Sequence, residues 1–342
     1  MRKDKFMDIK AWGVDKPNEK IHELHYQKEL GENEVLIHLK YCSLLRADVF
    51  FIENFWGDSK YPMVPSSEMF GVVSQVGKNV RDVETGDYVG ANYQVYSCGE
   101  CSYCKAGKEQ FCGKQRVIEA NEFGGLAENI IVDSRFVYKI PEKLQKPEYV
   151  GLMGYGLTAY SAIKNSNIKK GSKVGVLGVG NLGQFAVQIL NKMGFEVTAL
   201  THSDNKHENL RKIGAKDFLN PLDVKELENN KKTFDFIHVT SYHSYDWPKI
   251  IELLKPEGNL CFNGLPDENI SFPAVLLADY AQRKVTGSYL GSRNEMKELL
   301  EFAEKNDIKS ETTVYPLEKA QEVLDQIKEN KIPFYAAIKI EK

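Results

Sequence analysis

The pattern of hydrophobic residues changes near residue 150, and this change constrains the fold more than any other feature. Beyond that point, short apolar runs typical of strands alternate with amphipathic segments typical of helices. The first such pair is a strand at 173–178 followed by a helix at 182–193, and further strands are expected at 196–201, 234–240 and 259–263. Strands that alternate with helices predict a parallel, doubly wound sheet.

The residues before 150 follow a different pattern. Short β-rich runs such as 34–40 and 71–77 are broken by glycine, proline and asparagine, which indicates an irregular, mainly β domain. The chain has 342 residues, and two domains are expected for this length. We therefore predict an α/β protein with a mainly β domain at 1–149 and a doubly wound domain at 150–287. The segment 288–342 ends in a lone strand, which we expect to return to the first domain.

Composition excludes several classes of protein. Lys plus Arg number 45 and Asp plus Glu number 48, so the net charge of −3 recruits no nucleic acid. We find no apolar run long enough to span a membrane, and the N-terminal residues carry no apolar targeting segment. Six cysteines are too few for a disulfide scaffold in a chain of this length. These features predict a cytoplasmic protein without a membrane partner.

Four of the six cysteines, Cys98, Cys101, Cys104 and Cys112, lie within fifteen positions. Four thiolates satisfy tetrahedral Zn²⁺ and leave no open position for a substrate. The spacing therefore predicts one structural zinc ion that fixes a lobe with few apolar residues. The alternatives are an iron–sulfur cluster and four unrelated thiols.

A glycine pattern follows the predicted strand at 173–178. Gly178, Gly180 and Gly183, with Asn181 and Leu182 between the last two, form a G-x-G-x-x-G turn that opens a helix. In this context the glycines permit a tight turn, close approach of a pyrophosphate and close helix packing. We predict a dinucleotide-binding site here, and the alternative is a tight turn without a ligand.

The residues after the second strand favour one form of the cofactor. NAD-binding chains usually place Asp or Glu there, whereas this chain has Thr201, His202, Ser203 and Lys206. Without a carboxylate to repel it, a 2′-phosphate can be bound by Ser203 and Lys206, with His202 as a possible helper. NADP(H) is therefore predicted over NAD(H). The alternative is a solvated loop in which Asp204 binds the ribose.

Together these motifs resemble the zinc-type medium-chain dehydrogenase/reductase (alcohol dehydrogenase) family, and most closely its cinnamyl-alcohol-dehydrogenase-like branch. The resemblance covers nearly the whole chain, and its most specific parts are 64–68, 86–90, the cysteine lobe, 124–128, 178–183 and 287–292. It implies a GroES-like catalytic domain, a Rossmann domain, a cleft between them and commonly a homodimer. It also implies that Arg46 binds the cofactor pyrophosphate.

The catalytic zinc ligands of that family are missing. At the three matching positions this chain has Leu45, Ser67 and Gly154, and Ala47 replaces the hydroxyl that begins the family's proton relay. None of these side chains replaces a thiolate or an imidazole. The resemblance places Ser67 and Glu68 at the vacated site and Tyr155 beside it, so these three are the candidate catalytic residues. The alternatives are that Ser67 is small filler, that Glu68 pairs with a cation such as Arg46, and that Tyr155 packs against the nicotinamide.

Zinc polarises a carbonyl, and hydride transfer without it requires a substrate with its own electron sink. The leading hypothesis is therefore an NADP(H)-dependent oxidoreductase acting on a conjugated carbonyl or iminium. The alternatives are an alcohol/aldehyde oxidoreductase and a non-catalytic NADPH-binding protein. Aromatic residues on two loops favour an apolar or aromatic small-molecule substrate, although core packing explains them nearly as well: Phe51, Phe55, Trp56, Tyr61, Tyr93 and Tyr96.

Overall fold

The computed structural model describes residues 6–120, 122–266, 268–332 and 335–341. It divides into two compact units, one formed by Met1–Gly154 with Ser292–Lys342 and the other by Tyr155–Gly291. The divisions fall a few residues beyond the boundaries suggested by the sequence. No helix within the described ranges has the length and apolar character needed to cross a bilayer.

The first unit is built on an antiparallel sheet with the order β16-β17-β3-β4-β5-β9, and β8 also pairs with β3. Alternate residues of β3 are buried, as expected for a strand with one face on a core. The strands of this sheet are β3 (Glu34–Leu44), β4 (Met69–Val76), β5 (Tyr88–Ala91), β8 (Asn129–Asp133), β9 (Val137–Lys139), β16 (Thr312–Pro316) and β17 (Tyr335–Lys339).

Smaller elements complete this unit. The strands β1 (Phe6–Gly13) and β2 (His22–Glu29) form an antiparallel hairpin, and β6 (Gln94–Tyr96) pairs with β7 (Arg116–Val117). The helices are α1 (Arg46–Ile52), α2 (Ser102–Lys105), α9 (Arg293–Asn306) and α10 (Ala320–Lys328), with short 3₁₀ turns η1 (Glu109–Phe111), η2 (Ser134–Phe136), η3 (Glu142–Leu144), η4 (Pro147–Met153) and η6 (Leu317–Lys319).

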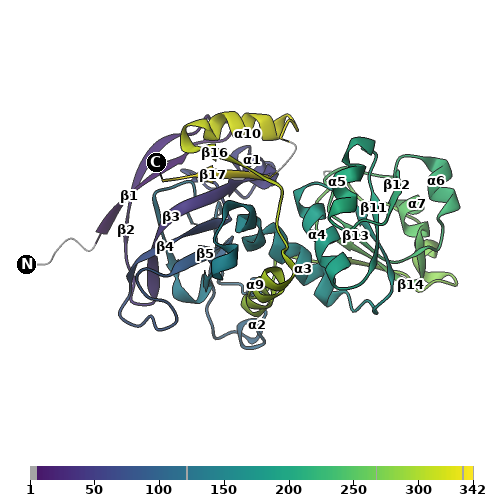
Figure 1. Ribbon diagram of the computed structural model, residues 1–342, viewed down its shortest axis with the longest axis horizontal. Helices are drawn as coiled ribbons and strands as arrows, with labels where there is room; N and C mark the ends of the chain where they lie inside the picture. Colours follow the sequence, from purple (N-terminus) through teal and green to yellow (C-terminus); the bar gives the residue numbers. More distant parts are fainter. Residues whose placement is uncertain (1–5, 121, 267, 333–334, 342) are drawn as a thin grey trace, which may run out of the picture. The chain divides into compact units, whose positions relative to one another are not determined.

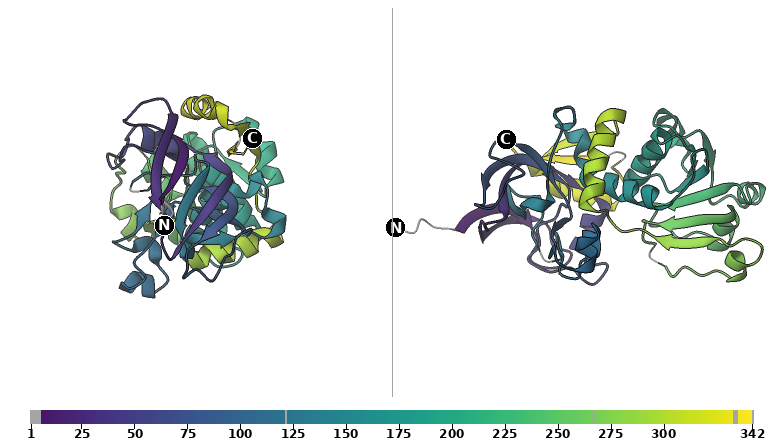
Figure 2. Two further views of the ribbon diagram at one scale, coloured as in Figure 1. Left: turned by 90° about the vertical axis from the view of Figure 1, so that its left-hand side faces the viewer. Right: turned by 90° about the horizontal axis from the view of Figure 1, so that it is seen from below.

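The C-terminal segment belongs to the first unit. β17 pairs antiparallel with β3, and Ile338 lies opposite Cys42. Figures 1 and 2 show α10, in yellow, beside the purple strands of the N-terminal half, and α10 contacts both α1 and β3. Helix α9 begins with a capping box, since Ser292 Oγ accepts from the Glu295 N–H and Glu295 accepts from the Ser292 N–H. The chain therefore returns to its first domain to complete the sheet.

The second unit contains a six-stranded parallel sheet with the order β12-β11-β10-β13-β14-β15. The order reverses at β10, and right-handed crossovers then place the connecting helices on both faces. Helix α4 packs on β10 and β11, and α7 packs on β14 (Figure 1). The elements are α3 (Tyr155–Asn165), β10 (Lys173–Leu177), α4 (Asn181–Lys192), β11 (Glu196–Leu200), η5 (Asp204–Lys206), α5 (His207–Lys212), β12 (Asp217–Leu219), α6 (Val224–Asn229), β13 (Phe234–Val239), α7 (Trp247–Glu252), β14 (Leu254–Phe262), α8 (Val275–Ala278) and β15 (Lys284–Gly287).

Candidate functional site

The four cysteines of the predicted zinc lobe lie together between β6 and β7. Their sulfur atoms are all within 4.8 Å of one another. Backbone N–H groups point at these sulfurs, with N···S distances of 3.4 Å from Cys101 to Cys98 and 3.5 Å from Cys104 to Cys101. Hydrogen bonds from the backbone of Glu100 and Cys101 lower the pKa of the Cys98 thiol to about 6. Four sulfurs held together in this way fit a structural zinc ion with no open coordination position.

The glycine turn has the geometry that a dinucleotide requires. Gly178 has φ +85°, a conformation that disfavours other residues. Gly180 is the N-cap of α4 and makes no side-chain cap, and a Cβ built on it would meet no atom within 4 Å. A Cβ on Gly183 would lie 2.3 Å from the Gly178 carbonyl oxygen. The turn therefore has no room for a side chain at Gly183. The space next to Gly180 is free of protein atoms, so a pyrophosphate can approach the helix N-terminus there.

The end of β11 presents polar side chains beside this turn. Thr201 is buried, and its Oγ1 accepts a hydrogen bond from the Ser203 N–H at 3.2 Å. His202 and Lys206 are exposed, and Ser203 is half-buried. Asp204 is also exposed and lies 3.7 Å from His207 Nε2. The loop therefore offers a hydroxyl and a cation, and it also offers the carboxylate of the alternative interpretation.

Arg46 is engaged within the first unit. Its guanidinium donates to the Lys328 carbonyl oxygen at 2.9 Å and to Asn330 Oδ1 at 2.8 Å, and it lies over the Phe50 ring. These contacts hold the end of α10. Binding of the cofactor pyrophosphate by Arg46 stays a prediction.

The three vacated ligand positions contain no metal-binding set. Leu45 is buried and aliphatic, Ser67 is partly exposed, and a Cβ on Gly154 would lie 2.2 Å from Glu68 Oε1. The Glu68 carboxylate thus occupies the space beside Gly154, and its Oε2 accepts a hydrogen bond from Ser43 Oγ at 2.8 Å. A leucine, a serine and a glycine do not fit a catalytic zinc ion.

The described residues contain only two groups of three or more possible metal ligands. One is the cysteine lobe, and the other is the group of Asp15, Glu19 and His22, which is not buried. Neither group includes Leu45, Ser67 or Gly154. Of the two groups, the cysteine lobe is the one whose four thiols fit zinc.

Tyr155 begins α3 in the second unit, whereas Ser67 and Glu68 belong to the first. Its hydroxyl lies 3.4 Å from the Tyr242 hydroxyl, which follows β13. Two phenols at this distance can share a hydrogen bond, so each can orient the other. Tyr242 was not predicted from the sequence, because no local motif links it to Tyr155.

Most of the aromatic residues singled out in the sequence pack on one another. The Phe51 ring lies 4.9 Å from Trp56 and 6.2 Å from Tyr93, and Tyr61 Oη donates to the Phe51 carbonyl oxygen. Tyr96 differs, since its ring contacts the guanidinium groups of Arg116 and Arg135.

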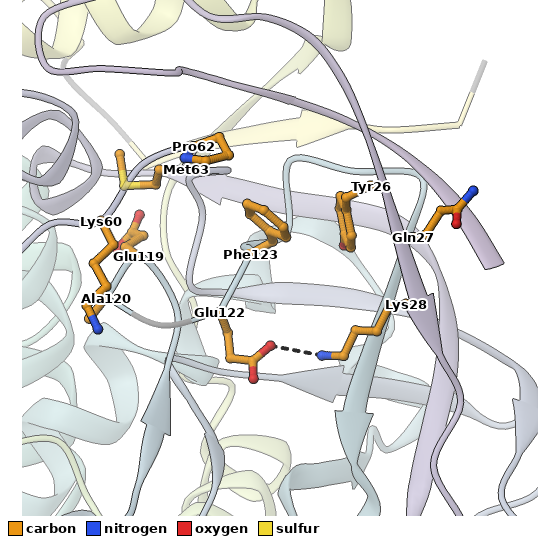
Figure 3. Close-up of a pocket in the computed structure, with 10 residues that line it drawn as sticks. All are labelled: Tyr26, Gln27, Lys28, Lys60, Pro62, Met63, Glu119, Ala120, Glu122 and Phe123. Atoms are coloured by element: carbon orange, nitrogen blue, oxygen red, sulfur yellow. Dashed lines mark hydrogen bonds and ion pairs between the residues drawn. The ribbon is translucent and has the colours of Figure 1, made fainter. Parts of the chain in front are cut away.

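A cavity of about 280 Å³ opens within the first unit (Figure 3). The Tyr26 and Phe123 rings lie 4.4 Å apart on one side of it, and Lys28 pairs with Glu122 at 2.9 Å. Glu119 lines the other side with Lys60 and Ala120. Glu119 is a second residue that the sequence analysis missed, because it lies in a loop without a recognisable motif.

Two protein-family models match the chain. The model described as "Alcohol dehydrogenase GroES-like domain" matches residues 31–142, and the one described as "Zinc-binding dehydrogenase" matches residues 181–305. "Probable formaldehyde dehydrogenase AdhA" of Bacillus subtilis (strain 168) is 32% identical over 92% of this chain and 92% of its own length. "Cinnamyl alcohol dehydrogenase 2" of Arabidopsis thaliana is 30% identical over 96% of this chain and 91% of its own length.

Solved structures agree with these relatives. A cinnamyl alcohol dehydrogenase from Sorghum bicolor has a TM-score of 0.92 and 26% identity, and covers 98% of both chains. A structure from Helicobacter pylori, titled as CAD complexed with NADP(H), has a TM-score of 0.91 and 29% identity over 98% of this chain and 99% of its own. Fold and site together define an oxidoreductase of the alcohol dehydrogenase type. The chain belongs to the zinc-type medium-chain dehydrogenase/reductase (alcohol dehydrogenase) family, in its cinnamyl-alcohol-dehydrogenase-like branch, which confirms the resemblance drawn from the sequence.

Proposed function

We propose that this protein is an NADP(H)-dependent reductase that transfers hydride to a conjugated carbonyl or iminium-type substrate without a catalytic zinc. One observation carries the proposal: the glycine turn for the cofactor is complete, while the catalytic ligand positions hold Leu45, Ser67 and Gly154. A conjugated substrate moves the charge of hydride addition onto a remote atom. The protein then needs only a hydrogen-bond donor for that atom and a nearby proton.

Ser67, Glu68 and Tyr155 are the residues to which we assign these tasks. The partial exposure of Ser67 supports a hydroxyl that donates to substrate. The buried hydrogen bond from Ser43 to Glu68 supports a carboxylate fixed in one position. The contact between Tyr155 and Tyr242 supports a phenol that is oriented before substrate binds. The nicotinamide supplies the hydride when it is bound.

A panel of paired substrates tests the proposal. Each enal or enone is compared with its saturated analogue while NADPH oxidation is followed, and a 4-deuterated NADPH shows which carbon receives the hydride. We expect at least about tenfold higher kcat/KM for the conjugated member of each pair. Conjugation spreads the negative charge that develops in the transition state, whereas the saturated analogue has no such electron sink. Equal rates for both members would contradict the proposal.

A second candidate is supported by the relatives named as alcohol and aldehyde dehydrogenases. In this case the chain oxidises simple alcohols, and hydrogen-bond donors replace the metal. Appreciable alcohol oxidation that is unchanged by chelators would favour this candidate. No consumption of NADPH with any substrate class would favour a cofactor-binding protein without catalysis.

The preference for NADP(H) is a separate proposal. It is supported by Thr201, which places no carboxylate at the end of β11, and by the exposed Lys206 beside Ser203. We expect Lys206→Ala to weaken NADPH binding about tenfold and to leave NADH binding unchanged, since one charge–phosphate contact is lost. If Asp204 binds the ribose instead, Asp204→Asn weakens NADH binding and Lys206→Ala has no effect.

We also propose a homodimer in a cytoplasmic, reducing compartment that keeps the four thiols available for zinc. β15 is an edge strand in the described part of its sheet. The segment between β14 and β15 exposes large apolar residues, including Leu265, Val275 and the 97% exposed Tyr280. Exposed apolar side chains on the segment that leads into a free strand edge support an interface. Sedimentation should report twice the mass of the chain, and a monomer would contradict this proposal.

A further inference from the structure

Two buried carboxyl groups meet beside the vacated metal position. Asp48 lies in the first turn of α1, and Glu119 follows β7; they are 1% and 2% exposed. Asp48 accepts hydrogen bonds from the Leu45 N–H at 2.5 Å and from the Ser66 N–H at 2.7 Å. Glu119 accepts from the same Ser66 N–H at 3.3 Å, and the two carboxyl groups are within hydrogen-bonding reach of each other.

The site has more acceptors than donors. An ionised carboxylate can only accept hydrogen bonds. Among the described residues, Glu119 Oε2 has no donor, although it is shielded from water. Two ionised carboxylates in contact and out of water would also repel each other strongly. One proton shared by the pair removes one charge and supplies an O–H donor between the two groups.

No cation offsets this pair among the groups that influence it in the described structure. Burial, followed by the charge of Asp48, raises the pKa of Glu119 well above its usual value, and burial raises that of Asp48. Cys42 of β3 is the other titratable group near Asp48, and burial raises its pKa to about 12, so it stays a neutral thiol. Lys60 and the Lys28–Glu122 pair line the adjoining cavity, and Figure 3 shows Lys28 directed at Glu122 rather than at Glu119.

The backbone at the pair is strained on both sides of the contact. Ser66 has φ 84° and Glu119 has φ 70°, and neither is glycine. Such conformations cost free energy and persist where the surroundings fix them. The hydrogen bonds of Asp48 and Glu119 to the Ser66 N–H provide this restraint.

We infer that Asp48 and Glu119 hold one shared proton at neutral pH, and that Glu119 is a positioning residue for Ser67. The proton bridge joins α1, which follows Leu45, to the loop of Glu119, and both carboxyl groups accept from the N–H of Ser66, the residue before Ser67. The shared proton rests on the burial of the two carboxyl groups and on the Ser66 N–H that donates to both, whereas the positioning role rests on the proposed function.

Infrared spectroscopy of the purified full chain tests the shared proton directly. The wild type should show the carbonyl stretch of a buried, protonated carboxylic acid at pH 7, shifted in ²H₂O. Glu119→Gln should lose this band, because its amide donates to an ionised Asp48, and Asp48→Asn should lose it as well. Glu122→Gln is the matched control from the same cavity and should keep the band. Absence of the band in the wild type, or its persistence in Glu119→Gln, would overturn the inference.

The pH dependence of unfolding gives a second test that needs no substrate. A carboxyl group whose folded pKa is raised stabilises the fold at low pH, and this contribution is lost as pH rises from about 4.5 through the folded pKa. The wild type should therefore lose stability relative to Glu119→Gln with rising pH, by about tenfold in the unfolding equilibrium constant per pH unit. Parallel profiles for the two proteins would contradict a shared proton.

Activity then tests the positioning role. Glu119→Gln should keep kcat/KM within about threefold of the wild type, while Glu119→Ala should lose about tenfold or more, mainly in kcat, because Asp48 is left as an unpaired buried charge. We expect kcat of the wild type to decline at alkaline pH as the shared proton is lost, and we expect no such decline in Glu119→Gln. If the infrared band follows the prediction but Glu119→Ala is fully active, the proton is shared and the positioning role is wrong. Failure of all substrates with an intact band would count against the proposed function alone.

Discussion

The resemblance places Gly154 where the family carries a cysteine ligand, and the Glu68 carboxylate lies where a side chain at 154 would stand. The contact between a built Cβ at 154 and Glu68 Oε1 is only 2.2 Å, and Glu68 is fully buried. Glu68 cannot move far, because its carboxylate also accepts the hydrogen bond from Ser43. The absence of a side chain at 154 therefore leaves the room that the Glu68 carboxylate occupies.

Gly154→Ala should destabilise the fold by about 1–3 kcal/mol, because the buried Glu68 must shift to admit a methyl group. Gly287→Ala is the matched control, since its Cβ would meet only one atom, at 3.9 Å. In a Glu68→Ala background the cost of Gly154→Ala should fall by at least about 1 kcal/mol. Denaturant unfolding of the four proteins measures this coupling, and strictly additive costs would contradict the account.

Because His238 is buried in the second unit, we expect acid to lower the stability of that unit. Burial lowers its pKa from 6.5 to about 4, although its Nε2 bonds to Asn263 Oδ1. Asn263 Nδ2 donates to the Ser288 carbonyl oxygen, so its Oδ1 faces the ring and Nε2 carries the hydrogen. In the unfolded chain His238 takes up a proton below about pH 6.5, whereas in the folded chain it does so only below about pH 4. The contribution of neutral His238 to the free energy of unfolding is therefore complete above pH 6.5 and is lost as pH falls to 4.

The wild type should lose roughly 3 kcal/mol through this group between pH 6.5 and 4. His238→Gln removes the titration and keeps a donor for Asn263, so its unfolding free energy should fall less steeply over the same range. Urea unfolding at several pH values measures both slopes. Identical slopes in the two proteins would show that His238 does not carry the effect.

At the scale of elements, the turn between β10 and α4 contains one glycine that matters for fold stability and another that matters for cofactor binding. Gly183 packs against the Gly178 carbonyl oxygen, whereas the space above Gly180 is open. The first glycine serves the packing of helix on strand, and the second serves the approach of a ligand.

Gly183→Ala should therefore destabilise the second unit by about 2 kcal/mol or more, since a Cβ would meet backbone that cannot move aside. Gly180→Ala should change stability by less than about 0.5 kcal/mol and still weaken NADPH binding about tenfold. Thermal unfolding with and without NADPH separates the two effects. Unimpaired NADPH binding by a folded Gly180→Ala variant would contradict the assignment of this turn.

Elements were predictable from sequence where periodicity was strong. The strand expected at 234–240 is β13 at Phe234–Val239, and the helix expected at 182–193 is α4 at Asn181–Lys192. The strand expected at 259–263 is the end of β14, which begins earlier, at Leu254, directly after α7 and Leu253. A short, buried apolar run is compatible with both a helix and a strand. The residue at which the strand begins therefore depends on the sheet that it joins, and not on the local sequence alone.

At the scale of the whole molecule, local motifs could identify the zinc lobe and the glycine turn because their residues are close in the chain. They could not reveal Glu119 beside Asp48, or Tyr242 beside Tyr155, because those pairs are 71 and 87 residues apart and meet only in the folded sheets. The resemblance drawn from the sequence predicted that positions 45, 67 and 154 carry no zinc ligand. What replaced them depends on side-chain packing, which the sequence does not display.

The central claim is that the family fold and its structural zinc are kept while catalysis proceeds without zinc. Zinc content per chain, measured by elemental analysis of the purified protein, tests it most directly. We predict one zinc per chain in the wild type and none in Cys104→Ser, because a four-thiolate site loses its closed geometry when one ligand is removed. Two zinc ions per chain, or one that persists in Cys104→Ser, would contradict the account.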